Sequence, residues 1–123
     1  MAEQLANLSR GNDISYSTDE QFTGKYWVDG RPVYQKTINF GALPNATQKL
    51  VAHGISNLDY TIDVWGIALN PTSVSHSIVT VPAPSTGTNV VTVYTTDTNV
   101  GVTTGGDRSA YTICYITIVY VKS

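Results

Sequence analysis

From Phe22 to the C-terminus, short runs of apolar and β-branched residues alternate with clusters of turn-forming residues. Runs of this length, rich in Val, Ile, Thr and Tyr, are typical of β-strands. They predict eight strands, at about residues 23–28, 32–40, 47–54, 58–69, 76–81, 88–95, 99–104 and 110–121. The separating segments are rich in Gly, Pro, Asn and Asp, which favour turns. This spacing predicts an all-β fold, an antiparallel β-sandwich that resembles a jelly roll.

The strongest local signal is Asp29-Gly30, which lies between two aromatic and β-branched runs. An Asp-Gly pair in this position predicts a β-hairpin with a two-residue type I′ turn and a positive φ at Gly30. In that register Trp27 lies opposite Pro32, and Tyr26 opposite Val33. Because Pro32 has no N–H to donate, we expect its strand to lie at the edge of a sheet.

Within residues 58–69, the pattern of polar and apolar positions changes part-way along the strand. Asp59, Thr61 and Asp63 alternate with apolar residues, as expected for a strand with one buried face. After Asp63 the same parity continues with apolar residues, from Trp65 to Leu69. We expect either a β-bulge at Gly66 or a partner that covers this end.

The last predicted strand, residues 110–121, is apolar on both faces. In a two-layer sandwich only one face of each sheet packs in the core. We therefore expect the other face to pack against neighbouring subunits. The residues expected at this subunit interface are Tyr111, Ile113, Tyr115, Val119 and Tyr120.

The composition narrows the possible functions. With 123 residues the chain is expected to form a single globular unit, and its net charge of −2 with scattered basic residues gives no support for nucleic-acid binding. No apolar run approaches the roughly 18 residues of a membrane helix, so no membrane insertion is expected. The first residues lack the apolar core of a signal peptide, so synthesis in a cytosol is expected.

Residues for catalysis or for metal and cofactor binding are few. His53 and His76 are far apart in different predicted strands, and Cys114 lies inside an apolar run, where a thiol is usually an inert small hydrophobe. Asp59 and Asp63 are separated by roughly 13 Å along one strand, too far for a glycosidase pair. We therefore expect a non-enzymatic protein with no metal or cofactor. We expect both histidines to be polar surface or interface residues.

Aromatic and acidic residues are the candidates for binding. Trp27 and Trp65 lie on otherwise polar faces. Asp59 and Asp63 could remain solvated, form part of a cation site, or accept hydrogen bonds from sugar hydroxyls. These four residues are the expected receptor or partner contacts. Asp107-Arg108-Ser109 is expected to form a hydrogen-bonded turn or an intersubunit pair that positions the last strand, rather than a receptor contact.

Three blocks of the sequence resemble a known family. They are YSTDEQFTGKYWVDGRPVYQKTINFGALPN, KLVAHGISNLDYTIDVWGIAL and GGDRSAYTICYITIVYVKS, which together span roughly residues 16–122. They are similar to the C-terminal β domain of bacteriophage tail-fibre and baseplate receptor-binding proteins. The resemblance implies a virion protein, often a homotrimer, that contacts the host surface. It divides the chain into an N-terminal neck or attachment segment, residues 1–15, and a β-sandwich head, residues 16–123.

The leading hypothesis is a trimeric tip domain of a tail fibre or baseplate that binds a host-surface glycan. It would be joined to other virion proteins through residues 1–15, of which residues 2–9 could form two helical turns. A capsid decoration or head-fibre protein with a structural role is the alternative, and the short N-terminal segment fits it. A third hypothesis, the accessory carbohydrate-binding module of a hydrolase, would need a catalytic domain elsewhere, because none is found in this sequence.

Overall fold

The computed structural model describes residues 14–74, 76–85 and 87–123, and this part of the chain is almost entirely β-structure. It contains eight strands and one short 3₁₀ helix, η1 (Gly87–Asn89). The strands are β1 (Gln21–Tyr26), β2 (Pro32–Asn39), β3 (Gln48–Ala52), β4 (Leu58–Leu69), β5 (Ile78–Val81), β6 (Val91–Thr95), β7 (Asn99–Thr104) and β8 (Ile113–Lys122). The predicted all-β fold is confirmed. The possible helical turns at residues 2–9 and most of the predicted neck lie outside the described residues.

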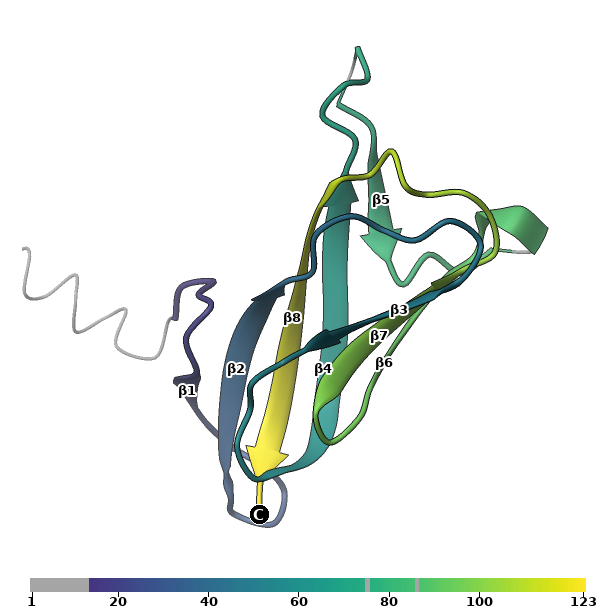
Figure 1. Ribbon diagram of the computed structural model, residues 1–123. Coiled ribbons are helices and arrows are strands. Elements are labelled where there is room, and N and C mark those ends of the chain that lie inside the picture. The colour runs from purple at the N-terminus through teal and green to yellow at the C-terminus, as the bar shows by residue number, and fades with distance from the viewer. Residues whose placement is uncertain (1–13, 75, 86) are drawn as a thin grey trace, which may run out of the picture.

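The strands form two antiparallel sheets, which lie face to face (Figure 1). The larger sheet has the order β1-β2-β8-β4-β5, and the smaller one has the order β3-β7-β6. The C-terminal strand β8 is thus inserted between β2 and β4, and β7 between β3 and β6. Such non-sequential neighbours are expected when a chain crosses repeatedly between two sheets, as in jelly rolls.

The core lies between the two sheets, and β8 contributes much of it. Cys114, Ile116, Ile118 and Tyr120 alternate along β8 toward the smaller sheet, and each is 0% exposed. The cluster also includes valines of β5, β6 and β7, Ile38 of β2, Ala68 of β4, and the loop residues Phe40, Leu43 and Ile55. Burial raises the pKa of the Cys114 thiol to about 12, so the thiol stays protonated and inert.

The predicted hairpin is present, but its turn is one residue longer than expected. The backbone N–H of Trp27 donates to Arg31 O at 2.8 Å, and that of Gly30 donates to Trp27 O at 2.9 Å. Tyr26 therefore pairs with Pro32 and not with Val33. Gly30 has the predicted positive φ, at 90°, whereas Asp29 does not share it. This is a type I turn closed by a glycine in the left-handed region. The Asp29 carboxylate favours it by accepting the Arg31 N–H at 3.1 Å.

The expected edge position of the Pro32 strand is wrong. Strand β2 lies between β1 and β8, and the edge strand on this side of the sheet is β1. Pro32 is tolerated because it is the first residue of β2, and the pairing with β8 begins only at Tyr34.

Strand β4 contains two β-bulges, both before Asp63, and the expected bulge at Gly66 is absent from the described strand. The change from polar to apolar residues after Asp63 therefore takes place on one face of the strand. The register with β8 shifts between Leu58 and Tyr60 and again between Thr61 and Asp63. Beyond the second bulge, Asp63 and Trp65 point away from the smaller sheet, while Gly66 faces it. At Gly66 the strands approach too closely for a side chain: a Cβ there would lie 2.5 Å from the Tyr115 backbone oxygen.

The turn before β8 is built as the sequence predicts. The Asp107 carboxylate accepts hydrogen bonds from the Ser109 N–H at 2.9 Å and from its hydroxyl at 2.6 Å, and these bonds hold the Asp107 pKa below its usual value. Arg108 donates to Asn89 O at 2.8 Å, which ties the turn to the η1 segment. These bonds are internal to the chain, in agreement with a positioning role for the turn.

Candidate functional site

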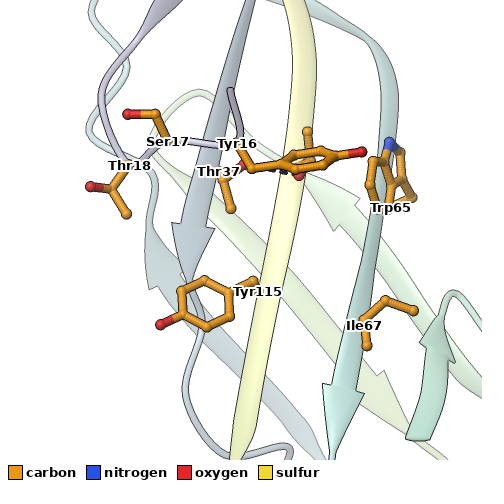
Figure 2. Close-up of a pocket in the computed structure, with 8 residues that line it drawn as sticks. Tyr16, Ser17, Thr18, Thr37, Trp65, Ile67 and Tyr115 are labelled. Atoms are coloured by element: carbon orange, nitrogen blue, oxygen red, sulfur yellow. Dashed lines mark hydrogen bonds between the residues drawn. The ribbon is translucent and has the colours of Figure 1, made fainter. Parts of the chain in front are cut away.

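The face of the larger sheet that points away from the smaller sheet, here called the outer face, carries an open pocket lined by aromatic and hydroxyl side chains. The pocket has a volume of about 470 Å³. Its lining residues are Tyr16, Ser17, Thr18, Thr37, Trp65, Ile67, Tyr115 and Thr117. Figure 2 shows the Tyr16 ring lying across β8 toward Trp65, with Tyr115 and Ile67 on the other side of the opening. We call this the aromatic pocket.

The sheet register explains why these side chains meet. Thr37 of β2 pairs with Thr117 of β8, which pairs with Trp65 of β4, so the three form one row across the sheet. Tyr115 and Ile67 pair in the next row on the same face. The rings of Tyr16 and Trp65 make an edge-to-face contact with centroids 5.7 Å apart. Three aromatic rings therefore surround a floor of threonine hydroxyls.

Residues 14–18 reach the outer face because the chain next to them is anchored. The Thr37 N–H donates to Ser17 O at 2.8 Å. Glu20 accepts hydrogen bonds from the Tyr120 hydroxyl at 2.6 Å and from the Lys122 ammonium at 3.0 Å. Burial and the Glu20 carboxylate raise the Tyr120 pKa. Although partial burial of Glu20 opposes its ionisation, the bonds from Tyr120 and Lys122 hold its pKa below the usual value.

The polar groups of the aromatic pocket are uncharged. The hydroxyls of Thr37 and Thr117 lie 3.0 Å apart and share one hydrogen bond, so the pair can still exchange a hydrogen bond with a ligand. Among the residues that the structure describes, the indole N–H of Trp65 has no hydrogen-bond acceptor. No charged side chain lines this pocket. Flat apolar walls with hydroxyl and N–H groups suit a neutral ligand with polar edges.

The four predicted contact residues fall in two separate places. Trp65 lines the aromatic pocket, and Asp63 lines a second pocket on the same face. Trp27 and Asp59 lie instead at the hairpin end of the molecule. There the Trp27 indole N–H donates to the Tyr60 hydroxyl at 2.6 Å, and Arg31 bonds Asp59 at 2.6 Å.

The charged side chains at this end pair with one another. We call the group formed by Trp27, Asp29, Arg31, Asp59 and Tyr60 the hairpin-end cluster. Arg31 also contacts Asp29 at 2.8 Å, and its guanidinium stacks 5.4 Å from the centre of the Tyr60 ring. The hydrogen bond from Arg31 lowers the Asp29 pKa, and the two carboxylates raise the Arg31 pKa. With its donors and acceptors paired internally, this cluster is better suited to holding the hairpin than to binding a ligand.

The predicted subunit-interface residues also divide. Tyr120 is 0% exposed and lies in the core of its own chain, so its expected place at an interface is wrong. Tyr111 packs against the same core and lies before β8. Ile113 and Tyr115 are exposed on the outer face, and Val119 is half-buried there. The difference arises because alternate residues of a strand point to opposite faces, and Tyr120 has the parity of the core residues.

The two histidines have different environments. His53 was expected at a surface or interface, but it is only 1% exposed. Its Nδ1 accepts the Ile55 N–H at 3.0 Å, and its Nε2 lies 2.9 Å from Thr96 O, so the ring is neutral with its proton on Nε2. It fixes the chain between β3 and β4. His76 is exposed.

The described residues offer neither a grouped set of metal ligands nor a membrane-spanning helix. Within residues 14–74, 76–85 and 87–123, no three His, Cys, Asp or Glu side chains are grouped closely enough to hold a metal ion. In the same part of the chain, no helix is long and apolar enough to cross a membrane.

Sequence reasoning missed several pocket residues. Tyr16, Ser17 and Thr18 precede the first predicted strand, and nothing in their local pattern places them over β8. Thr37 and Thr117 are separated by most of the chain, and only the β2–β8 register brings them together. The sequence does show one threonine within each of two otherwise apolar strands. That these two threonines lie side by side on one face becomes clear only once the strand order is known.

Comparison of the chain with protein-family models, with curated proteins and with solved structures gives no match.

Proposed function

We propose that this chain is a non-enzymatic bacteriophage virion protein, a tip domain of a tail fibre or baseplate that binds a glycan on the host cell surface. The aromatic pocket is the observation that carries the proposal. The resemblance of residues 16–122 to receptor-binding domains of tail fibres and baseplates supports the same class. The fold alone does not select this function, since β-sandwiches serve many.

A glycan fits the chemistry of the aromatic pocket. A pyranose ring has apolar C–H faces, which stack on the rings of Tyr16, Trp65 or Tyr115, and a rim of hydroxyls, which bond to the Thr37–Thr117 pair. A volume of about 470 Å³ lies within the usual range of small-ligand sites. Because the pocket is open and its lining is uncharged, it favours a neutral sugar that enters from solvent.

The proposal includes a homotrimer, and one end of the outer face supports it. There Ile113 pairs with Leu69, and Leu69 pairs with Ile78, to form a purely aliphatic row. Ile113 and Ile78 are 42% and 61% exposed. Packing this row against a neighbouring subunit would remove apolar surface from water and leave the aromatic pocket open. The three binding sites of one trimer would then give stable attachment by avidity, even if each single site binds weakly. Residues 1–15 would join the trimer to other virion proteins.

The test is retention of the purified protein on intact bacteria and on their isolated cell-wall polysaccharides. The Trp65→Ala variant should lose retention, because it removes one wall of the aromatic pocket. The matched Trp27→Ala variant, which changes the hairpin-end cluster, should retain it. Sedimentation of the wild-type protein should show a trimer at micromolar concentration. Absence of binding to every polysaccharide, or equal loss in both tryptophan variants, would contradict the proposal.

A further inference from the structure

A second pocket lies on the outer face beside the aromatic pocket and differs from it in charge. Its volume is about 590 Å³, and Lys25, Gln35, Asp63 and Val119 are among its lining residues. Gln35, Val119 and Asp63 form one row across β2, β8 and β4. We call this the charged pocket.

The register fixes how the two pockets are related. The row Gln35–Val119–Asp63 lies two residues along the strands from the row Thr37–Thr117–Trp65, which forms the floor of the aromatic pocket. Two residues of a strand correspond to about 7 Å. A linear oligosaccharide of two or more residues is longer than this separation, so a single ligand can occupy both rows.

The charges of the second pocket are placed for hydrogen bonding. Lys25 comes from the edge strand β1 and Asp63 from β4, with β2 and β8 between them. Three strand spacings separate the two backbones by about 14 Å. Neither side chain forms an ion pair with another residue in the described ranges. The ammonium can donate and the carboxylate can accept, while a purely anionic sugar would be repelled by Asp63.

We propose that the charged pocket is a second subsite of the same glycan site, so that the ligand is a linear, neutral oligosaccharide of at least two residues rather than a terminal monosaccharide. This inference rests on the proposed function. One residue stacks in the aromatic pocket. The next places its hydroxyls between Asp63, which accepts hydrogen bonds, and Lys25, which donates them.

The experiment uses a cell-wall polysaccharide that binds the protein in the retention assay. Monovalent fragments of this polysaccharide are separated by size and titrated into the protein by calorimetry. Fragments of two to four residues should bind at least about tenfold more tightly than the monosaccharide, because a hydrogen bond to a charged group in a partly enclosed site is worth about that factor. Asp63→Asn and Lys25→Met should reduce the affinity for the longer fragments toward that of the monosaccharide, and leave monosaccharide binding unchanged. Asp97→Asn, at an exposed acid in the β6–β7 turn, is the matched control and should change neither.

The outcomes separate the two proposals. If no polysaccharide is retained, the proposed function fails and the second subsite fails with it. If the monosaccharide binds as tightly as the longer fragments, and Asp63→Asn has no effect on either, the second subsite is overturned while the proposed function stands. A preference for anionic fragments over neutral ones of the same length would also overturn it.

Discussion

Strand β8 presents two apolar faces in very different environments. Toward the smaller sheet, Cys114, Ile116, Ile118 and Tyr120 are completely buried. On the outer face, Ile113 and Tyr115 are 42% and 45% exposed, while Thr117, which pairs with Thr37, and Val121 near the end of the strand are buried. The second sheet covers one face of β8, and the short segment before β1 crosses part of the other. An apolar face of a strand is therefore not always part of the core, because its burial depends on which elements pack against it.

The chemistry of the two faces differs in the same way as their burial. The inner face is nearly all aliphatic or aromatic, and its one phenol bonds to Glu20. The outer face grades from an aliphatic row at Ile113, through the aromatic pocket, to the charged row at Asp63. A face that mixes apolar rings with hydroxyls and charges can release and rebind a hydrated ligand, whereas a purely aliphatic face favours permanent burial. The inner face therefore stabilises the fold, and we propose that the outer face serves recognition.

The largest expected effect comes from truncating the same residue type on the two faces of β8. Ile116→Ala should lower the free energy of unfolding by about 2–5 kcal/mol, because it leaves a cavity in a closed core. Ile113→Ala should lower it by no more than about 1 kcal/mol within one subunit, since the side chain is already partly solvated. Denaturation in urea measures both. Equal losses of unfolding free energy in the two variants would show that the two faces of β8 do not differ in burial as described.

The next effect concerns β4, where inner and outer positions also alternate. Gly66→Ala should lower the free energy of unfolding by about 1–3 kcal/mol, because its Cβ would lie 2.5 Å from the Tyr115 backbone oxygen and 2.9 Å from Cγ1 of Ile116. Ile67→Ala, on the adjacent outer position, should cost less. Thermal unfolding of both variants provides the measurement. A neutral Gly66→Ala would show that β4 and β8 do not approach as closely as described.

The fold was largely predictable from the sequence, because β-branched runs and turn residues mark the strands well. Bulges are harder: the two extra residues in β4 place Thr61 toward the smaller sheet and Asp63 away from it, although the alternating pattern put both on one face. No single residue type marks these bulges in the sequence. The hairpin length was missed because Asp29 can either adopt a positive φ or use its carboxylate to cap the turn, and the structure uses the carboxylate. Trp65 and Asp63 were found as candidates from their polar surroundings. Tyr16 and the threonine pair required the strand order, which local patterns do not contain.

The smallest expected effect tests the anchor that holds the residues over the outer face. Since the Glu20 pKa is lowered from 4.5, the ionised carboxylate contributes stability that is fully present above that value and is lost as the pH falls through the folded-state pKa. Glu20→Gln should therefore lower the free energy of unfolding near neutral pH by less than about 1 kcal/mol, because the side chain is partly exposed.

The difference between wild type and Glu20→Gln should disappear in acid, which urea denaturation at a series of pH values between 7 and about 3 would follow. Asp19→Asn is the neighbouring control, since the described residues offer its carboxylate no hydrogen-bond donor. A constant difference across this range would mean that the charge of Glu20 does not anchor the segment.

The most direct test of the central claim, that the outer face binds the glycan, uses the two tryptophans as matched probes. Trp27→Phe leaves Trp65 in the aromatic pocket as the single indole, and Trp65→Phe leaves Trp27 in the hairpin-end cluster. On titration with a retained cell-wall oligosaccharide, the emission of the Trp65 protein should change saturably, because a sugar ring would replace water at the indole, and that of the Trp27 protein should stay constant. A saturable change confined to Trp27 would contradict the account and move the binding site to the hairpin end.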